Sequence, residues 1–233
     1  MQTLTSAHPS FRYLWSSNRS DTSTPKYLAA RNVLVGEAPP SLVGNWANGR
    51  AARLVQKLGL SKVSEFELED LGETNSLVIR NLLRSVLQPV LGERSIRYLS
   101  TDYGAIVGGG LPYHHDMPYS NGIFGAWCIE GPPERTVRFG EMDIEVPFKP
   151  GTVVVFDPAQ PHALLNGKRQ FEETDYAPTD LVGMVGFVAL RTPKACAALG
   201  IEAYGPKKHK GIRTTPNQFE ACPRTGRIPG LAR

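Results

Sequence analysis

Two adjacent histidines and an aspartate stand near the middle of the chain, in the stretch LPYHHDMPYSNG at residues 111–122. On an extended strand, side chains at positions i and i+2 project to the same side. The imidazole of His114 and the carboxylate of Asp116 can therefore converge on one ion, whereas His115 would point to the opposite side. We expect His114 and Asp116 to be metal ligands, and His115 to support a ligand or to contact a substrate.

A third candidate ligand, His162, follows the stretch KPGTVVVFDPAQP, which has the pattern of a buried strand and a short proline-bearing turn. It would reach the ion from a separate strand. Two histidines and one carboxylate on one side of an ion leave three coordination positions open, which is the facial triad of non-haem Fe(II) oxygenases. The spacing therefore predicts a metal centre formed by His114, Asp116 and His162.

Short β-branched or aromatic segments, bounded by Gly, Pro or Asp, fill the second half of the chain and would position these ligands. Met142, Ile144 and Val146 alternate with charged residues, as in a half-buried strand, whereas TVVVF is apolar throughout and should be covered on both faces. Such closely spaced strands are typical of an all-β sandwich or barrel. The expected segments are 94–108, 122–131, 135–140, 142–148, 151–157, 161–166 and 181–190.

The first half of the chain differs in pattern. Residues 1–30 are polar and rich in Ser and Thr, which favours loop, and NVLVG then predicts a short strand ending at Gly36. Ser41 is a plausible N-cap for a helix over residues 42–59. A second helix fits residues 74–92, with Thr74 or Asn75 as its cap, with Pro89 and Gly92 as its stop, and with a buried face. That face is expected to hold Leu77, Leu82, Val86 and Val90.

The fold class is therefore mainly β with flanking helices (α+β), in which two helices brace one face of a double sheet. We expect an N-terminal extension with bracing helices at 1–93, a catalytic core at 94–192 and a basic C-terminal extension at 193–233, together forming one compact domain. The 41% hydrophobic and 21% charged fractions are those of an ordinary globular protein.

Charge and cysteine usage suggest a compartment. No secretory signal pattern and no apolar run long enough for a bilayer are seen, so we expect no membrane association. The three widely spaced cysteines predict free thiols in a reducing cytoplasm. Lys and Arg are concentrated in residues 205–233, and this basic tail leaves nucleic acid open as a partner. The oligomeric state is not readable from the sequence.

The combination of YGAIVGGGLPYHHD with VRFGEMDIEVPFKPGTVVVFDPAQPHAL resembles the Fe(II)- and 2-oxoglutarate-dependent dioxygenases, over roughly residues 94–192. The resemblance implies a double-stranded β-helix (jelly-roll or cupin-like) core, with His114, Asp116 and His162 as ligands of Fe(2+). It also makes Tyr103 a candidate 2-oxoglutarate contact. In this family 2-oxoglutarate chelates the iron, O2 is consumed, and succinate and CO2 leave as a substrate is hydroxylated. An aspartate at position 116 argues for hydroxylation over halogenation.

The family also has a basic residue after the distal histidine that binds the far carboxylate of 2-oxoglutarate. Arg191 is our first choice, on the premise that residues 170–180 form an inserted loop, and Arg169 is the second. Arg135 and Arg138 are further options on a middle strand. Arginine suits the role because its fork of donors matches a carboxylate bidentately.

The resemblance leaves the substrate open among free amino acids, small metabolites, protein side chains and alkylated nucleobases. We favour a small molecule such as a free amino acid or a related metabolite. The segment DMPYSNGIFGAW is expected to contribute to the substrate wall, with Tyr119, Asn121 and Trp127 as candidates beside His115.

Other readings of the sequence remain. A cupin shares the double-stranded β-helix and would imply a metal-dependent isomerase, an oxygenase without a keto acid or a sugar-binding module, but its first motif needs HxH followed closely by Glu. A β-sandwich binding module with incidental histidines is a non-enzymatic alternative. Residues 33–39 also resemble the VGEAP turn of uracil-DNA glycosylase relatives; β-rich sequence soon follows, so we interpret Glu37 as a loop residue.

Overall fold

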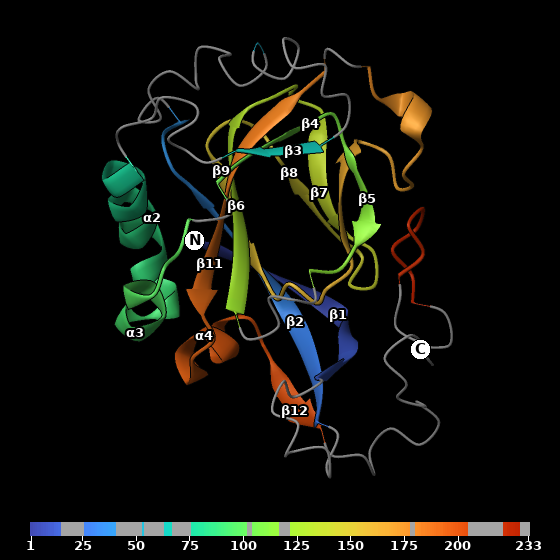
Figure 1. Ribbon diagram of the computed structural model, residues 1–233. Helices are drawn as coiled ribbons and strands as arrows, with labels where there is room; N and C mark the ends of the chain where they lie inside the picture. The colour runs from blue at the N-terminus through green and yellow to red at the C-terminus, as the bar shows by residue number, and fades with distance from the viewer. Residues whose placement is uncertain are drawn as a thin grey trace.

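Two antiparallel β-sheets lie face to face, and helices cover the outer side of the larger one (Figure 1). The computed structural model describes residues 1–14, 26–40, 53, 63–66, 76–101, 104–116, 122–177, 180–204 and 221–228. The larger sheet has the order β1 (Gln2–Leu14), β2 (Lys26–Glu37), β9 (Thr152–Phe156), β6 (Gly122–Glu130), β11 (Val182–Leu190), β4 (Ala105–Gly108) and β3 (Val63–Phe66), and β12 (Glu202–Tyr204) also pairs with β2. The smaller sheet has the order β5 (Leu111–His114), β10 (His162–Asn166), β7 (Arg135–Phe139) and β8 (Ile144–Pro147).

The strand segments predicted for the second half of the chain are confirmed with one exception. Strands β6 to β11 lie within the six expected ranges from 122 to 190. In the first range, 94–108, β4 is the one strand among the described residues, and Glu93–Arg97 form the short helix α3 instead. The alternation in β8 buries Ile144 and Val146 and exposes the residues between them, as the pattern predicted.

The large sheet is covered on both faces, and its central strands alternate between two cores. In β6, Phe124 and Ala126 face the small sheet, whereas Ile123 and Trp127 face the helices. Every residue of β9 is buried, which confirms the prediction for TVVVF. The interior between the sheets is therefore built from every second side chain of each strand, as the pleat requires.

Helix α2 (Ser76–Leu91) packs on the large sheet through a row of residues four positions apart, together with α3 and α4 (Pro193–Ala198). The buried row is Ile79, Leu83, Leu87 and Leu91. The predicted face was wrong at its start, because Leu77 is 64% exposed, and the other three predicted residues flank the row and are only partly buried. Gly92, with φ 86°, ends the helix as expected.

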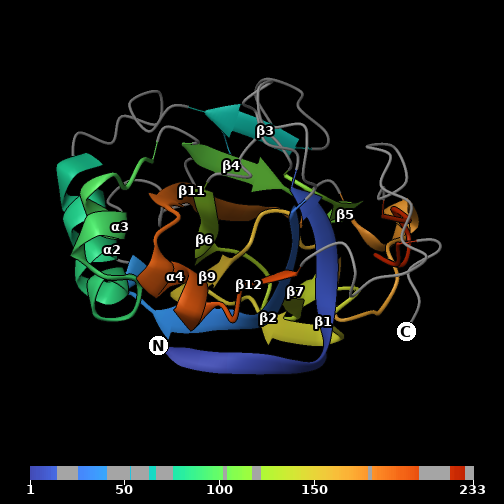
Figure 2. The same cartoon turned by 90° about the horizontal axis from the view of Figure 1, so that it is seen from below.

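Residues 1–30 were predicted as mainly loop, and this was wrong for residues 2–14 and 26–30, which are strand; residues 15–25 lie outside the described residues. Strands β1 and β2 pair antiparallel, with a register shift between Thr5 and Ser10. Figure 2 shows β1 as a bent strand at the edge of the large sheet, beside β2. The hydroxyl of Ser6 donates to the Met142 carbonyl at 2.6 Å, next to the small sheet. Since β2 also pairs with β9, the N-terminal segment contributes strands to the core sheet. Glu37, interpreted from the sequence as a loop residue, is the last residue of β2 and pairs with Thr152 of β9, so that interpretation was wrong. The helix predicted at 42–59, and the caps Thr74 and Asn75, lie outside the described residues.

The described part of the basic C-terminal segment, residues 221–228, lies beside β5 (Figure 1). The Tyr113 amide donates to the Pro223 carbonyl at 2.9 Å, and the Ile228 amide donates to the Glu141 carboxylate at 2.6 Å. This segment therefore packs against the outer side of β5, the strand that carries His114.

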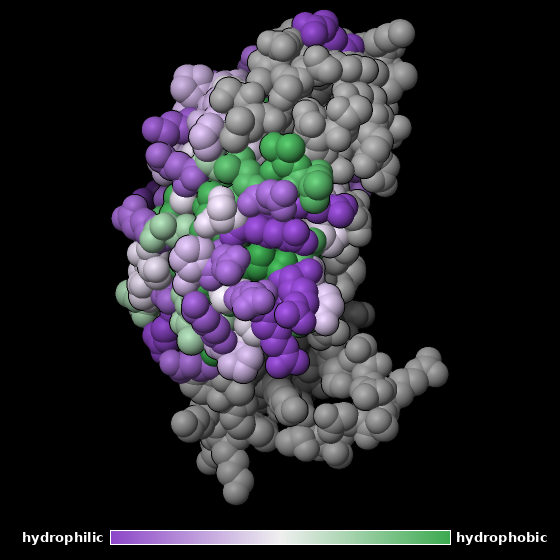
Figure 3. Space-filling model, turned by 90° about the vertical axis from the view of Figure 1, so that its left-hand side faces the viewer, coloured by the Kyte–Doolittle hydropathy of each residue, from purple (hydrophilic) through white to green (hydrophobic). Residues whose placement is uncertain are grey.

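The outer side of the helices is mainly hydrophilic (Figure 3). Apolar side chains gather on this face level with the N-terminal end of α2. Leu77 and Val78 are exposed there. Among the described helices, none is long and apolar enough to cross a lipid bilayer.

The three cysteines are free thiols, as predicted, and they should differ in reactivity. Burial raises the pKa of Cys128 to about 12, whereas the Thr225 hydroxyl and the backbone amides of Arg224 and Thr225 lower the pKa of Cys222. Because the thiolate is the reactive form, we expect iodoacetamide at pH 7.5 to label Cys222 before Cys128 in the native protein. Peptide mass spectrometry checks this order, and equal labelling in 6 M guanidinium is the control.

Candidate metal centre

The three predicted ligands converge at one end of the small sheet. His114 is the last residue of β5, His162 is the first residue of β10, and the two residues face each other in the antiparallel register. Asp116 follows two residues after β5 and lies between them. Its Oδ1 is 3.6 Å from His114 Nε2, and its Oδ2 is 3.2 Å from His162 Nε2. One ligand atom from each residue lies within 4.8 Å of the other two.

These separations suit a transition-metal ion. Ligand atoms about 2.1 Å from one ion and at right angles to each other are ~3.0 Å apart. In both histidines Nδ1 contacts a backbone carbonyl at 2.8 Å. His114 contacts the carbonyl of Pro112, and His162 contacts the carbonyl of Gln160. Such a contact fixes the proton on Nδ1 and leaves Nε2 as the ligand atom. The donor set and its hydrogen bonds therefore fit a metal such as Fe(II).

The ring of His162 is held by aromatic packing. Its centroid lies 4.5 Å from that of Phe156 and 4.3 Å from that of His114.

The protonation states of the ligands suit metal binding. Burial, and then the neighbouring His162, lower the pKa of His114 to about 4. Burial alone would raise the pKa of Asp116, but the hydrogen bond and charge of His162, with smaller contributions from His114 and His115, lower it overall. Near neutral pH the site therefore offers a neutral imidazole at His114 and a carboxylate at Asp116, which are the forms that bind a metal.

A cavity of about 140 Å³ between the two sheets opens beside these ligands. Apart from the three ligands and Glu65, its lining is apolar. Glu65, on β3, is the one further charged side chain among the described lining residues, and no described Lys or Arg lines the cavity. The apolar lining comes from both sheets: Ile106, Leu111, Phe124, Ala126, Val137, Phe156, Ala163, Leu164 and Met184.

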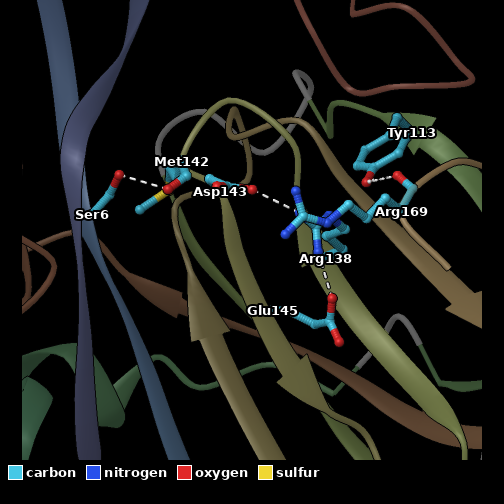
Figure 4. A network of polar contacts seen from close by, with 7 residues as sticks. All are labelled: Ser6, Tyr113, Arg138, Met142, Asp143, Glu145 and Arg169. Carbon is cyan, nitrogen blue, oxygen red and sulfur yellow. Dashed lines mark hydrogen bonds and ion pairs between the residues drawn. The ribbon is translucent and has the colours of Figure 1, made fainter. Parts of the chain in front are cut away.

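The two arginines predicted first as anchors of 2-oxoglutarate are engaged elsewhere. Arg191 follows β11, and its Nη2 donates to the buried carboxylate of Asp157 at 3.0 Å. Between β10 and β11, the described residues of the segment predicted as an inserted loop include one 3-10 turn, η3 (Glu173–Asp175). Arg169 is exposed, and its carbonyl accepts the Tyr113 hydroxyl on the outer side of the small sheet (Figure 4). Neither arginine lines the cavity.

Arg135 and Arg138 lie on opposite faces of β7. Arg138 faces outward and forms ion pairs with Asp143 and Glu145 (Figure 4). Arg135 is fully buried; its Nη2 donates to the Asp180 carbonyl at 2.9 Å, and its guanidinium lies 5.1 Å from the centre of the Tyr176 ring. Within the described residues, Nε and Nη1 of Arg135 have no hydrogen-bond partner. The interior of the protein thus contains a cation without a described acidic partner.

The predicted substrate contacts are placed differently from one another. His115 does not line the cavity, and its Nδ1 contacts the Ala159 carbonyl at 2.8 Å. Trp127 is fully buried against the helices, donates to the Ala38 carbonyl at 3.1 Å and does not line the cavity. Its neighbours Phe124 and Ala126 line it instead. Tyr103, Tyr119 and Asn121 lie outside the described residues.

Sequence reasoning missed Asp157, Glu65 and the inward direction of Arg135. The sequence signal for Asp157 was its place directly after an apolar strand, and alternation with Val137 could have indicated the direction of Arg135. Glu65 has no comparable signal.

No protein-family model matches the chain, and a search among curated proteins finds no significant match.

Proposed function

We propose that this protein is a non-haem Fe(II) oxygenase that uses 2-oxoglutarate and O2 to hydroxylate a small molecule. The observation that carries the proposal is the convergence of His114, Asp116 and His162 beside an apolar cavity. Two imidazoles and one carboxylate with open positions are the donor set of the Fe(II) oxygenases.

The order of the strands supports a double-stranded β-helix. From β4 to β11 the chain passes between the sheets repeatedly, giving β9-β6-β11-β4 in one sheet and β5-β10-β7-β8 in the other. This interleaving brings the ends of β5 and β10 together although 48 residues separate His114 from His162. It is the arrangement expected for the Fe(II)- and 2-oxoglutarate-dependent superfamily, and cupins share it.

In the proposed reaction, His114, Asp116 and His162 hold the metal, and the carbonyls of Pro112 and Gln160 keep the imidazole protons on Nδ1. Bound Fe(II) would supply the open positions at which the keto acid and O2 react. The apolar lining, including Phe124 and Met184, excludes water and orients the carbon to be oxidised.

Arg135 is the cation that we assign to the far carboxylate of 2-oxoglutarate. Arg135 is not among the residues that line the cavity, but it shares the inner face of β7 with Val137, which does line it. It lies toward the end of β7 opposite to the end that pairs with His162. Its buried Nε and Nη1 are available to a carboxylate. A buried donor without a partner is costly, so an anionic ligand would complete its hydrogen bonds.

We expect Arg135→Met to weaken 2-oxoglutarate binding by about 10- to 100-fold while Fe(II) still binds. This loss corresponds to the 1.5–3 kcal/mol of a hydrogen bond to a charged group. Arg135→Lys keeps the charge but loses the fork, so its loss should be smaller. Isothermal titration of the Fe(II)-loaded protein with 2-oxoglutarate, in the absence of O2, measures both. An unchanged affinity in Arg135→Met would exclude Arg135 as the anchor.

The cavity limits the substrate. The described residues around the cavity of about 140 Å³ are mainly apolar, so a small apolar part of the substrate fits it best. The carboxylate of Glu65 favours a cationic group on the part that stays outside. A free amino acid with an aliphatic or aromatic side chain meets both conditions.

The decisive experiment is an anaerobic titration of the apo-protein with Fe(II) and then with 2-oxoglutarate. A visible charge-transfer band that requires both additions, followed by succinate release in air, is the expected result. Metal binding without this band would favour an oxygenase that uses no keto acid, an alternative that the lack of a described cation in the cavity lining makes worth testing. Absence of metal binding would remove the basis of the proposal.

A further inference from the structure

The loop at residues 157–161, which joins β9 to β10, supplies three backbone carbonyls to the segments that carry the metal ligands. The Pro158 carbonyl accepts the amide of Asp116 at 2.8 Å. The Ala159 and Gln160 carbonyls contact Nδ1 of His115 and Nδ1 of His162, each at 2.8 Å. The positions of Asp116 and His162 therefore both depend on the conformation of this one loop.

The conformation of this loop depends on Asp157. Its carboxylate is almost fully buried, and Oδ1 accepts the Ala159 amide at 3.2 Å and Nη2 of Arg191 at 3.0 Å. Its carbonyl accepts the Gln160 amide at 2.8 Å, which closes the turn. The side chain and the backbone of Asp157 thus fix the same two residues, Ala159 and Gln160, whose carbonyls contact the histidines.

Arg191 connects the loop to the large sheet. It lies directly after β11, and besides Asp157 its Nη2 contacts the Gly122 carbonyl, at the start of β6, at 3.3 Å. Its side chain is 12% exposed. A buried carboxylate without a counter-charge is strongly unfavourable, so loss of either partner would displace the other or admit water. The ion pair therefore connects the loop to β6 and β11 of the large sheet.

We propose that the Asp157–Arg191 ion pair is the positioning device of the metal centre. It binds no metal; it fixes the loop whose carbonyls orient His162 and anchor the backbone of Asp116. This inference rests on the proposed metal site, and it assigns Arg191 a role different from that of a 2-oxoglutarate anchor.

The test is Co(II) affinity, measured by titration and by the visible spectrum of the Co(II)-loaded protein, in Asp157→Asn and Arg191→Gln. Partners that orient metal ligands are typically worth 10–100-fold in affinity, and we expect both variants to lose about this much, with an altered Co(II) spectrum. Arg191→Lys keeps the charge and should recover most of the affinity. The double variant Asp157→Asn with Arg191→Gln leaves no buried charge, so it should recover thermal stability without recovering Co(II) affinity.

Glu145→Gln is the matched control. It neutralises one partner of Arg138, another arginine of low exposure, in an ion pair on the outer face of β7 (Figure 4). We expect its Co(II) affinity to equal that of the unmodified protein. If the variants of the Asp157–Arg191 pair bind Co(II) as tightly as the unmodified protein, or if affinity merely follows thermal stability in all variants, the inference is wrong. If the unmodified protein binds no Co(II), the proposed metal site fails, and the inference fails with it.

Discussion

Replacement of Asp116 by Ala is expected to weaken Fe(II) binding by more than ~100-fold, beyond the 10–100-fold range typical of groups that only orient a ligand. Its carboxylate is the only anionic donor of the cluster and lies between the two imidazoles, 3.6 Å from His114 Nε2 and 3.2 Å from His162 Nε2. Removing it leaves two neutral donors for a divalent cation. His114→Ala and His162→Ala should show losses of the same order. Anaerobic titration with Fe(II), detected by competition with a chelator, measures the affinities.

His115→Ala is the informative control for this series, because His115 is adjacent to a ligand but contacts the Ala159 carbonyl with Nδ1. Its effect on the Fe(II) affinity should stay within about tenfold, at or below the lower end of the range for orienting groups. If His115→Ala and Asp116→Ala lose equal affinity, the ion is bound by a different set of residues. If Asp116→Ala retains full affinity, the centre formed by the three ligands does not exist.

Trp127→Ala is expected to cost about 3–5 kcal/mol of folding free energy, the range for deleting a large buried aromatic side chain. Trp127 is fully buried between the large sheet and the helices, and its indole N–H donates to the Ala38 carbonyl at 3.1 Å. The variant therefore loses apolar burial and leaves a buried acceptor without its donor. Guanidinium denaturation followed by circular dichroism measures the change.

Tyr98→Ala provides the comparison, since Tyr98 is 62% exposed and its removal should change stability by no more than ~0.5 kcal/mol. Trp127→Phe, which keeps most of the volume, should fold and bind Fe(II) normally. A loss of substrate affinity in Trp127→Phe with unchanged stability would contradict the placement of Trp127 in the helix-facing core and would restore it as a substrate contact.

Local patterns predicted much of the second half of the chain. In β8, apolar residues alternate with charged ones, which predicted burial on one face, and this is confirmed. In β9, every residue but the first is apolar, which predicted burial on both faces, and this is also confirmed. The same reasoning failed for β1, because a polar segment rich in Ser and Thr has no periodic signal of its own. That segment becomes a strand by pairing with β2, which itself pairs with β9. Strand formation at such positions is decided by a partner distant in the sequence.

The arginines show the same limit at the level of single side chains. The resemblance to the 2-oxoglutarate-dependent dioxygenases implied a cation, and the sequence offered Arg191 first, Arg169 second, and Arg135 and Arg138 as further options. Ion pairs separate them: Arg191 pairs with Asp157, Arg138 pairs outward with Asp143 and Glu145, and Arg135 has no acidic partner among the described residues. Buried Nε and Nη1 atoms without a described partner are common to Arg135 and Arg191. Trp127 is similar, because which face of β6 meets the cavity depends on the packing of the two sheets.

The sequence by itself determined the identity of the three candidate ligands, the β-rich character of the second half and the free state of the cysteines. These follow from residue chemistry and from spacing over a few positions, because the position of a residue along a strand determines the side to which its side chain points. The convergence of His114 and His162, the loop held by Asp157 and Arg191, and the inward position of Arg135 were decided by the tertiary structure. Each depends on which strands become neighbours, and that choice is made by the burial of apolar side chains across the whole chain rather than by any local pattern.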